Sequence, residues 1–368
     1  MRKTKLSALA LTLFSFVTMA SCNQSTFEYA LVTDVGDIDD QSFNQTSWEA
    51  LKDYATAKGK TYAYYRPVAD STDDRVASIE QAIQKGAKVI VCPGFLFEEA
   101  VYNVQDKYPE VKFVLIDGQP HTADYATYKT AKNTVSIIYQ EEISGYLAGY
   151  AAVKEGKKAL GFCGGMAVPA VQRFGSGFVQ GADAAATELG ITSEVSVKYY
   201  YAGAFAATDE ATAKMKSWYT SGTECVFACG GKVYQSVTEG IGTTGGTWIG
   251  VDVDQSKSVK NPAPLTSATK GLKESVTSAL EVYNTDTWND ISGKNYNLGL
   301  NSTFGTVAAK DYVGLPTESG SWNFKQFTIA QYNELLGKLK SGELTVSNST
   351  TAAPTTTISV TWESQFAN

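Results

Sequence analysis

The sequence predicts an α/β protein built around parallel β-sheets and divided into two domains. Short runs rich in β-branched and apolar residues alternate with segments of helical periodicity, which is the pattern of βαβ units. Runs such as KVIVC and FVLI are apolar throughout, as expected for strands of a sheet that is covered on both faces. The 368 residues exceed the usual size of one domain, so two domains of about 150 residues each are expected.

The expected elements follow one another in a regular order along the chain. β-Branched and aromatic residues dominate the strands, and apolar residues recur every three to four positions in the helices between them. The expected strands are residues 27–34, 62–65, 88–92, 112–116, 158–163, 194–200, 225–229 and 247–251. The expected helices are residues 43–58, 73–85, 98–108, 141–155, 171–189, 209–221 and 232–240. From residue 342 onward the chain is rich in Ser and Thr, and we expect an exposed, partly disordered ending of strand and loop.

The first residues have the layout of an export signal. Three basic residues precede an apolar run at residues 6–17, which is too short to span a bilayer of about 30 Å. Small residues then lead directly into Cys22, as in the lipobox of bacterial lipoproteins, where this cysteine is diacylated and the chain is cut before it. We therefore expect lipidation at Cys22. An ordinary signal peptide beside a chance cysteine is the alternative.

The charge of the mature chain limits the classes of partner. Removal of residues 1–21 takes away three basic residues and no acidic one, so the formal charge changes from -7 to -10. An acidic surface argues against nucleic acid as a partner and against adsorption to anionic lipid headgroups. Attachment to a membrane would therefore depend on the lipid at Cys22.

Residues that commonly carry catalysis or bind metals are sparse. Four cysteines lie in apolar, strand-like runs and are expected as buried thiols, although an exported chain could pair them: Cys92, Cys163, Cys225 and Cys229. His121 is the only histidine, so neither a zinc site nor a Ser–His nucleophile is expected. Asp37, Asp39 and Asp40 are interpreted as part of a solvated loop that caps the helix at residue 43. We expect no cofactor, no metal and no enzymatic reaction.

Glycine, aspartate and aromatic residues gather where the expected strands end. In parallel sheets, ligands bind beyond the carboxyl ends of the strands, where loops lead into helix N-termini. Phe43 and Phe205 are candidate plates for a flat ring, with packing in the core as the alternative. The candidate acceptors for polar ligand atoms are Asp34, Asp117 and Asp252. The candidate donors are Asn44 and Lys270. This inventory favours a protein that binds a polar heterocycle carrying a sugar.

Several longer motifs resemble one protein family. VTDVGDIDDQSFNQTSWEAL closely resembles the opening signature of the basic membrane protein (BMP) family of purine-nucleoside-binding lipoproteins, and GFCGGMAVPAVQRFGSGFVQGA resembles its second signature. CVFACGG, WIGVDVDQ and LTSATK follow in the order of the family. The resemblance runs from about Phe27 to about Glu274, with weaker cover to about Leu339. It implies a type I periplasmic-binding-protein fold, with two doubly wound parallel-sheet lobes joined by three crossovers, and an ABC-transporter receptor without catalysis.

The resemblance also implies roles for single residues. Asp34 would touch the base or ribose, Phe43 and Phe205 would stack on the purine from opposite lobes, and Asn44 would bond to the ring edge. Asp117 would take polar atoms of the base, the backbone at Gly230 would approach the ligand, and Asp252 and Lys270 would hold the ribose hydroxyls. The chain departs from the family at two places, and both concern ligand preference. The family often has an aspartate shortly after the phenylalanine, whereas here three residues separate Phe205 from Asp209. The family often has acidic or bulky residues near positions 166–171, where this chain has small ones.

Together these observations predict a monomeric, lipid-anchored receptor on the extracytoplasmic face of the cell membrane. It would bind a purine nucleoside of the guanosine, adenosine or inosine class and deliver it to an ABC permease. A receptor for a sugar or other small polar ligand, a nucleoside-sensing signalling lipoprotein and a nucleoside hydrolase are the alternatives. The expected division is a signal peptide (1–21), a lipidated linker (22–26), an N-terminal lobe (27–132 plus about 253–310), a C-terminal lobe (133–252 plus about 311–345) and a tail (346–368).

Overall fold

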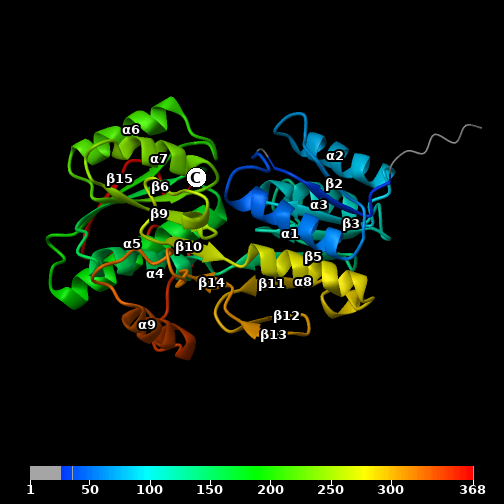
Figure 1. The fold of residues 1–368 in the computed structure, drawn as a ribbon. Helices are drawn as coiled ribbons and strands as arrows, with labels where there is room; N and C mark the ends of the chain where they lie inside the picture. The colour runs from blue at the N-terminus through cyan, green and yellow to red at the C-terminus, as the bar shows by residue number, and fades with distance from the viewer. Residues whose placement is uncertain (1–25, 35, 368) are drawn as a thin grey trace, which may run out of the picture.

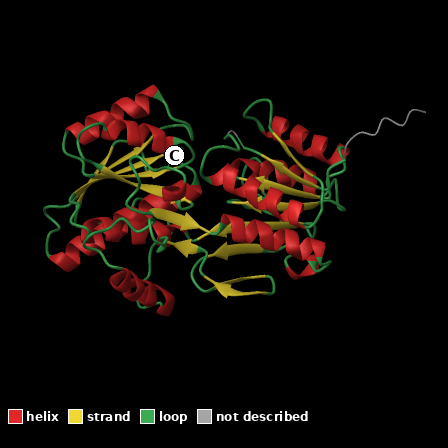
Figure 2. Cartoon of the chain, viewed as in Figure 1, coloured by secondary structure: helices red, strands yellow, loops and turns green. Residues whose placement is uncertain are grey.

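The chain folds into two lobes that lie side by side, each with its own parallel sheet between layers of helices (Figures 1 and 2). The structure is a computed structural model and describes residues 26–34 and 36–367, so the expected signal peptide and Cys22 lie outside the described residues. Within the described part, no helix is both long and apolar enough to cross a membrane.

The first lobe is built on a six-stranded parallel sheet with the order β11-β5-β4-β3-β1-β2. Its strands are β1 (Tyr29–Val32), β2 (Tyr62–Tyr65), β3 (Val89–Pro93), β4 (Lys112–Ile116), β5 (Thr134–Tyr139) and β11 (Asn295–Leu298). One face packs against α1 (Phe43–Ala57) and α8 (Leu272–Asn284), and the other packs against α2 (Thr72–Gln84) and α3 (Glu98–Gln105). The strands β3 and β4 are almost wholly buried, which explains their unbroken apolar sequences.

The second lobe is built on a seven-stranded sheet with the order β14-β10-β9-β8-β6-β7-β15. Its strands are β6 (Ala159–Gly164), β7 (Ser196–Tyr201), β8 (Cys225–Cys229), β9 (Thr247–Asp252), β10 (Ser267–Lys270), the antiparallel β14 (Val313–Gly314) and β15 (Ser359–Trp362). The helices α4 (Glu141–Lys154) and α5 (Pro169–Leu189) pack on one face, and α6 (Asp209–Thr220) and α7 (Val233–Ile241) on the other. The helix α9 (Ile329–Ser341) and the hairpin of β12 (Ser302–Phe304) and β13 (Val307–Lys310) lie outside the two sheets.

The described chain passes between the two sheets three times: after β5, after β10 and after β11. This topology confirms the α/β class with parallel sheets. The domain ranges expected from the sequence stay a prediction, but three strands do not lie where these ranges put them, because β5 and β10 belong to the other lobe and β15, in the expected tail, belongs to the second sheet. Strand β5 pairs with β4 in the first sheet, and β10 pairs with β9 in the second. The polypeptide therefore crosses at the ends of these strands.

Helices α4 and α5 approach each other unusually closely because glycines line their contact. A Cβ atom added at Gly145 or Gly149 of α4 would stand 2.1 or 2.0 Å from a backbone oxygen of α5. A Cβ atom at Gly177 or Gly181 of α5 would stand 2.0 Å from a backbone oxygen of α4. Real Cβ atoms do not come so close to other atoms, so only glycine permits this backbone contact. It brings the N-terminus of α4 directly against the first turns of α5.

The C-terminal segment is ordered by pairing rather than by its own sequence. Strand β15 runs parallel to β7, with Val360 opposite Val197. One carboxylate oxygen of Asp183 accepts hydrogen bonds from the backbone N–H groups of Thr357 and Ile358. The expected strand is therefore present. The four cysteines of the described chain, Cys92, Cys163, Cys225 and Cys229, are buried free thiols, as the sequence predicts.

Candidate functional site

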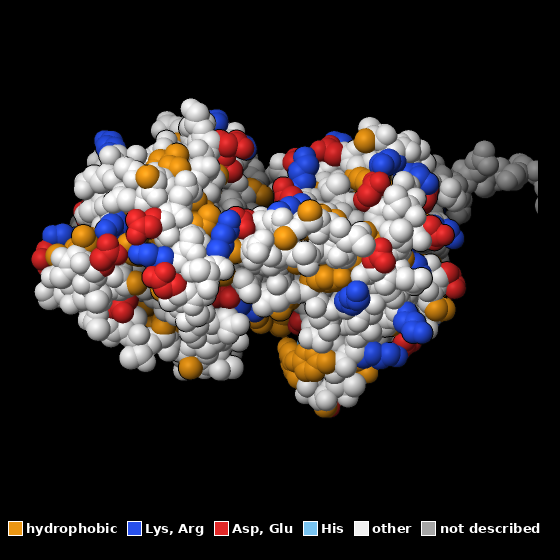
Figure 3. Space-filling view, turned by 90° about the horizontal axis from the view of Figure 1, so that it is seen from below, with side chains coloured by type: hydrophobic (Ala, Val, Ile, Leu, Met, Phe, Trp, Pro, Cys, Tyr) orange, Lys and Arg blue, Asp and Glu red, His pale blue; other side chains and the backbone are white. Residues whose placement is uncertain are grey.

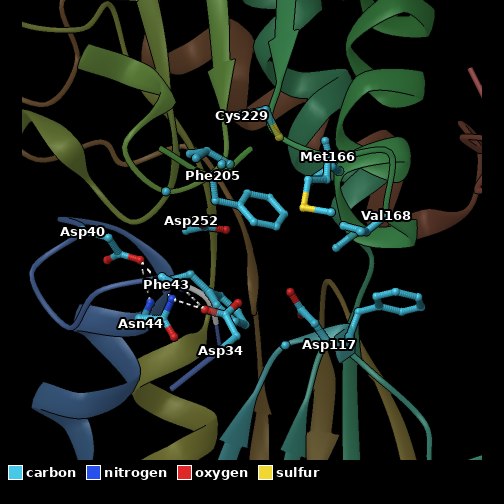
Figure 4. A pocket seen from close by; sticks show the side chains of 18 of the residues that line it. Asp34, Asp40, Phe43, Asn44, Asp117, Met166, Val168, Phe205, Cys229 and Asp252 are labelled. Atoms are coloured by element: carbon cyan, nitrogen blue, oxygen red, sulfur yellow. Dashed lines mark hydrogen bonds between the residues drawn. The ribbon is translucent and has the colours of Figure 1, made fainter. Parts of the chain in front are cut away.

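A cavity of about 360 Å³ lies between the two lobes, at the carboxyl ends of both sheets. All eight residues predicted for a ligand site line it: Asp34, Phe43, Asn44, Asp117, Phe205, Gly230, Asp252 and Lys270. In Figure 4, Asp34, Asp40 and Asn44 form a group on one side, whereas Asp117 lies on the other and the Phe205 ring points into the space between the lobes. The strand-end rule therefore brings together segments that are far apart in the sequence.

The polar wall beside α1 is a network of two carboxylates and one amide. Asp34 Oδ1 accepts hydrogen bonds from the backbone N–H of Gly36 (2.7 Å) and from Asn44 Nδ2 (2.9 Å). Asn44 Nδ2 is also 3.3 Å from Asp40 Oδ2. Burial raises the pKa of Asp34 above its ordinary value, despite these hydrogen bonds, which lower it.

Asp40 caps helix α1, as interpreted from the sequence, but it is buried rather than solvated. Its carboxylate accepts from the backbone N–H groups of Ser42, Asn44 and Gln45 at 2.9–3.1 Å, and only 2% of the residue is exposed. Burial raises the pKa of Asp40 to about 6. The Asn44 amide nitrogen is thus already engaged by two carboxylates. Reversing the amide would turn its oxygen towards both carboxylates, where neither side has a hydrogen to donate. The amide nitrogen of Asn44 therefore faces the two carboxylates and does not donate to the ligand.

A buried ammonium group forms the charged floor of the cavity. Lys270 Nζ forms an ion pair with Asp117 and lies 3.4 Å from Asp252 Oδ1 and 3.6 Å from Glu141 Oε1. Burial alone would lower the pKa of Lys270, but the charges of the three carboxylates outweigh burial and raise it. Burial raises the pKa of Asp117 to about 7, although the charge of Lys270 opposes this shift. Asp117 therefore belongs to the group around Lys270 rather than to the group around Asp34.

Two aspartates of this floor hold a backbone conformation that few residues adopt. Asp117 has φ of 60° and Asp252 has φ of 66°, both in the left-handed region. Aspartate tolerates this region better than most residues. Asp117 directly follows β4 and Asp252 is the last residue of β9, so the conformation turns the chain at the sheet edge and directs each carboxylate to Lys270. One oxygen of Asp117, Oδ1, is buried and has no hydrogen-bond partner.

The two predicted aromatic plates come from different lobes. Phe43 begins α1, and the Lys270 ammonium lies 4.7 Å from the centre of its ring. Phe205 follows β7 in the second lobe, and both phenylalanines are only partly buried. A Cβ atom at Gly230 would stand 2.8 Å from the Phe205 ring, so the missing side chain there makes room for Phe205. Gly230 also lines the cavity, and the implied approach of its backbone to the ligand stays a prediction.

Several contacts join the lobes around the cavity. Ser42 Oγ donates to Asp252 Oδ2 at 2.6 Å. Near the mouth, Lys232 Nζ of the second lobe lies 3.2 Å from Asp37 Oδ2 and 2.8 Å from Asp39 Oδ1 of the first. The lobes are thus held together by polar contacts. The space-filling view shows acidic and basic side chains interspersed on both lobes, with a notch between them on this face (Figure 3).

Sequence reasoning missed some residues at or behind the cavity. Met166, Val168, Val171 and Phe174 form an apolar wall from the second lobe. Glu141 stands behind Lys270 and forms ion pairs with Lys270 and Arg173. Lys232 stands at the mouth and forms an ion pair with Asp39. The apolar residues could have been predicted from the sequence, because the segment MAVPAV follows the end of a strand. Lys232 could have been predicted in the same way, because it follows the glycines after β8. Glu141 could not, because an acid at a helix start is common in any protein.

Comparisons with known proteins agree with this architecture. Over 249 residues the chain is 29% identical to a Lactococcus lactis subsp. cremoris protein named "ABC transporter nucleoside-binding protein BmpA"; the match covers 63% of this chain and 66% of that relative. An uncharacterized lipoprotein of Pyrococcus horikoshii is 29% identical over 220 residues, which is 56% of this chain and 52% of the relative. The chain thus spans less than two thirds of the length of these relatives.

A crystal structure of ABC transporter solute-binding proteins from Aeropyrum pernix K1 has the same fold, with a TM-score of 0.72 at 19% identity over 89% of this chain and 94% of that chain. A family model described as "ABC transporter substrate-binding protein PnrA-like" matches residues 27–340, most of the described chain. The resemblance seen in the sequence motifs is thereby confirmed. The chain belongs to the PnrA-like, or Bmp, family of ABC transporter substrate-binding proteins.

Proposed function

We propose that this protein captures purine nucleosides outside the cytoplasm and delivers them to an ABC permease. One observation carries the proposal: a single cavity between two lobes contains two aromatic rings and a buried ammonium group surrounded by carboxylates. A purine nucleoside needs both features, because its base is flat and its ribose is rich in hydroxyls. Guanosine, adenosine and inosine are the class of ligand proposed, and the name of the Lactococcus relative supports this class.

The base would lie between Phe43 and Phe205, one from each lobe. Stacking of a base on an aromatic ring typically contributes about 1–3 kcal/mol. The carboxylate of Asp34 stands at the edge of this space, where it accepts hydrogen bonds and prefers a base edge that carries N–H groups. Closing the lobes on the ligand would remove it from water and strengthen these polar contacts.

The ribose would lie over the charged floor. A carboxylate such as Asp252 accepts from two neighbouring hydroxyls, and the ammonium of Lys270 donates to the same oxygens. Charged partners make hydrogen bonds of about 1.5–3 kcal/mol, which is stronger than neutral ones. The unpartnered Oδ1 of Asp117 offers a further acceptor in the same region. This arrangement supports recognition of the sugar as well as the base.

We propose a binding protein rather than an enzyme. The family to which the chain belongs consists of substrate-binding proteins. The ammonium of Lys270 is held by carboxylates that raise its pKa, so it is poorly suited to act as a base or a nucleophile. Incubation with inosine should therefore yield neither hypoxanthine nor ribose, and release of either product would contradict this part of the proposal.

The protein would work as a monomer held at the membrane by lipid on Cys22. The lipobox-like sequence supports this anchor, as does the description of the Pyrococcus relative as a lipoprotein. Lipidation would place the receptor on the extracytoplasmic face, next to its permease. Mature wild-type protein should enter the detergent phase of a detergent partition, whereas Cys22→Ser should not. Wild-type protein in the aqueous phase would contradict the anchor.

The ligand class is tested by a thermal-shift screen of purified protein against nucleosides, free bases and sugars. A ligand that binds only the folded state stabilises it by about 2.7 kcal/mol at a concentration of 100 times its Kd. Purine nucleosides should give the largest rise in melting temperature. A larger rise with a sugar such as galactose or arabinose, and none with nucleosides, would replace the proposed ligand by a sugar.

A further inference from the structure

We propose that the buried pair of Glu141 and Arg173 positions the Lys270 ammonium and thereby sets the preference of the receptor for ligands with ribose hydroxyls. This inference rests on the proposed function and deepens it. Neither residue lines the cavity, so both would act through Lys270, which does. They are therefore positioning residues rather than ligand contacts.

Glu141 stands between two cations. Arg173 Nε donates to Glu141 Oε2 at 2.6 Å, and the other oxygen, Oε1, lies 3.6 Å from Lys270 Nζ. The Glu141 side chain is fully buried and that of Arg173 is 12% exposed. Oε1 has no hydrogen-bond partner, so the carboxylate attracts Lys270 by charge without taking one of its protons at hydrogen-bond distance.

The Lys270 ammonium is thus held among three carboxylates from different elements. Asp117 follows β4 of the first lobe, Asp252 ends β9 of the second, and Glu141 begins α4. Of the three carboxylates, only Asp117 accepts a hydrogen bond from Nζ, and an ammonium has three N–H donors. The other donors remain available to a ligand oxygen as long as neither Asp252 nor Glu141 moves closer.

Arg173 keeps Glu141 from competing with the ligand. A buried carboxylate without its partner would be drawn to the nearest cation, because an unpaired buried charge is costly. Without Arg173 that cation is Lys270, and Glu141 would take the donor intended for the ribose. Without the charge of Glu141, Lys270 would instead settle more closely on Asp117. Either change moves the ammonium away from the sugar.

The close packing of the α4 and α5 backbones explains why Glu141 and Arg173 can form an ion pair. Glycine contacts bring α4 and α5 together, so that the first residue of α4 meets an early residue of α5. The same two helices carry a second ion pair near their other end, where Lys154 Nζ lies 2.9 Å from Glu188 Oε1. Neither residue of that second pair lines the cavity, so it provides a matched control for loss of an α4–α5 ion pair.

The test is calorimetric titration of the full mature protein with guanosine and with 2′,3′-dideoxyguanosine, which keeps the base and the 5′ hydroxyl but lacks the 2′ and 3′ hydroxyls. Arg173→Met and Glu141→Gln should each raise the Kd for guanosine about tenfold, the value of one well-placed hydrogen bond, and leave the Kd for the dideoxy ligand nearly unchanged. Arg173→Lys, which keeps the charge, should recover part of the preference. Lys154→Met should bind both ligands like wild type.

Thermal unfolding of each variant shows whether it folds; if Arg173→Met does not, Glu141→Gln and Arg173→Lys carry the test. If wild type prefers guanosine, equal losses of affinity for both ligands in the variants, or no loss for either, would overturn the positioning role. Wild-type protein that binds neither ligand would contradict the proposed function itself. The two failures are therefore distinguishable by the wild-type titration.

Discussion

Replacing Gly149 by alanine should destabilise the second lobe, because the new methyl group has no space between α4 and α5. Its Cβ atom would stand 2.0 Å from the backbone oxygen of Phe178, whereas an ordinary contact begins at 3.4 Å. The helices would have to separate by roughly 1.4 Å, and the obstacle is backbone rather than a flexible side chain. Overpacking of this kind costs about 1–3 kcal/mol, occasionally more.

The helix propensity of alanine opposes this cost by about 1 kcal/mol. Because the obstacle is backbone, we expect the overpacking cost in the upper part of that range, at about 2–3 kcal/mol, so the net loss is about 1–2 kcal/mol and the melting temperature falls by several degrees. The matched control is Gly337→Ala in α9, where the added Cβ meets nothing within 4 Å. This control should gain about 0.5–1 kcal/mol. Urea unfolding followed by circular dichroism measures both, and a Gly149→Ala protein as stable as Gly337→Ala would refute the close helix contact.

Three further predictions concern ligand exchange, pH and stacking. Lys232→Met removes the ion pairs with Asp37 and Asp39 across the cavity mouth. Nucleoside dissociation should therefore become faster and less dependent on salt in stopped-flow experiments. An unchanged rate would mean that these exposed pairs do not restrain the opening of the lobes. Burial, with the charge of Glu141, raises the pKa of Glu142 from 4.5 to about 7. The stability that Glu142 contributes to the folded state is therefore fully present below pH 4.5 and is lost as the pH rises through about 7. Glu142→Gln should therefore gain roughly 1–3 kcal/mol at pH 8 and flatten the pH dependence of urea unfolding, and an unchanged slope would count against this assignment. Phe205→Ala should weaken nucleoside binding in calorimetry by about 1–3 kcal/mol with little loss of fold, and the reverse pattern would identify Phe205 as a core residue.

The sequence predicts the regular part of the fold closely because buried parallel strands and amphipathic helices have strong patterns. The helix expected at residues 43–58 is observed at Phe43–Ala57, and the strand expected at residues 225–229 is observed at Cys225–Cys229. The strand β5 and the elements between residues 252 and 342 were not predicted, and for the C-terminal segment a strand was expected without its bounds. Strand β11 has the polar sequence NYNL and exists because it pairs with β5, and β15 likewise depends on β7. Such strands are specified by tertiary contacts rather than by local pattern.

The site could be predicted in part for a similar reason. Residues at strand ends share one edge of a parallel sheet, so Asp34, Asp117 and Asp252 could be assigned to one cleft without coordinates. The hydrogen-bond and ion-pair partners of these site residues could not be predicted from the sequence. Asn44 was expected to donate to a ligand, but its amide nitrogen serves two carboxylates. The link from Arg173 through Glu141 to Lys270 depends on how closely two helices pack, which no short motif reveals.

The central claim is that the cavity reads both the base and the ribose of a purine nucleoside. Calorimetry of wild-type protein and Asp252→Ala with guanosine, 2′-deoxyguanosine and guanine tests it most directly. Wild type should bind guanosine most tightly and the other two measurably more weakly, because a site built to hold hydroxyls is left with unpaired polar groups when they are missing. Asp252→Ala should lose about 2–5 kcal/mol of guanosine binding. Equal wild-type affinities for the three ligands, with no loss in Asp252→Ala, would contradict the account.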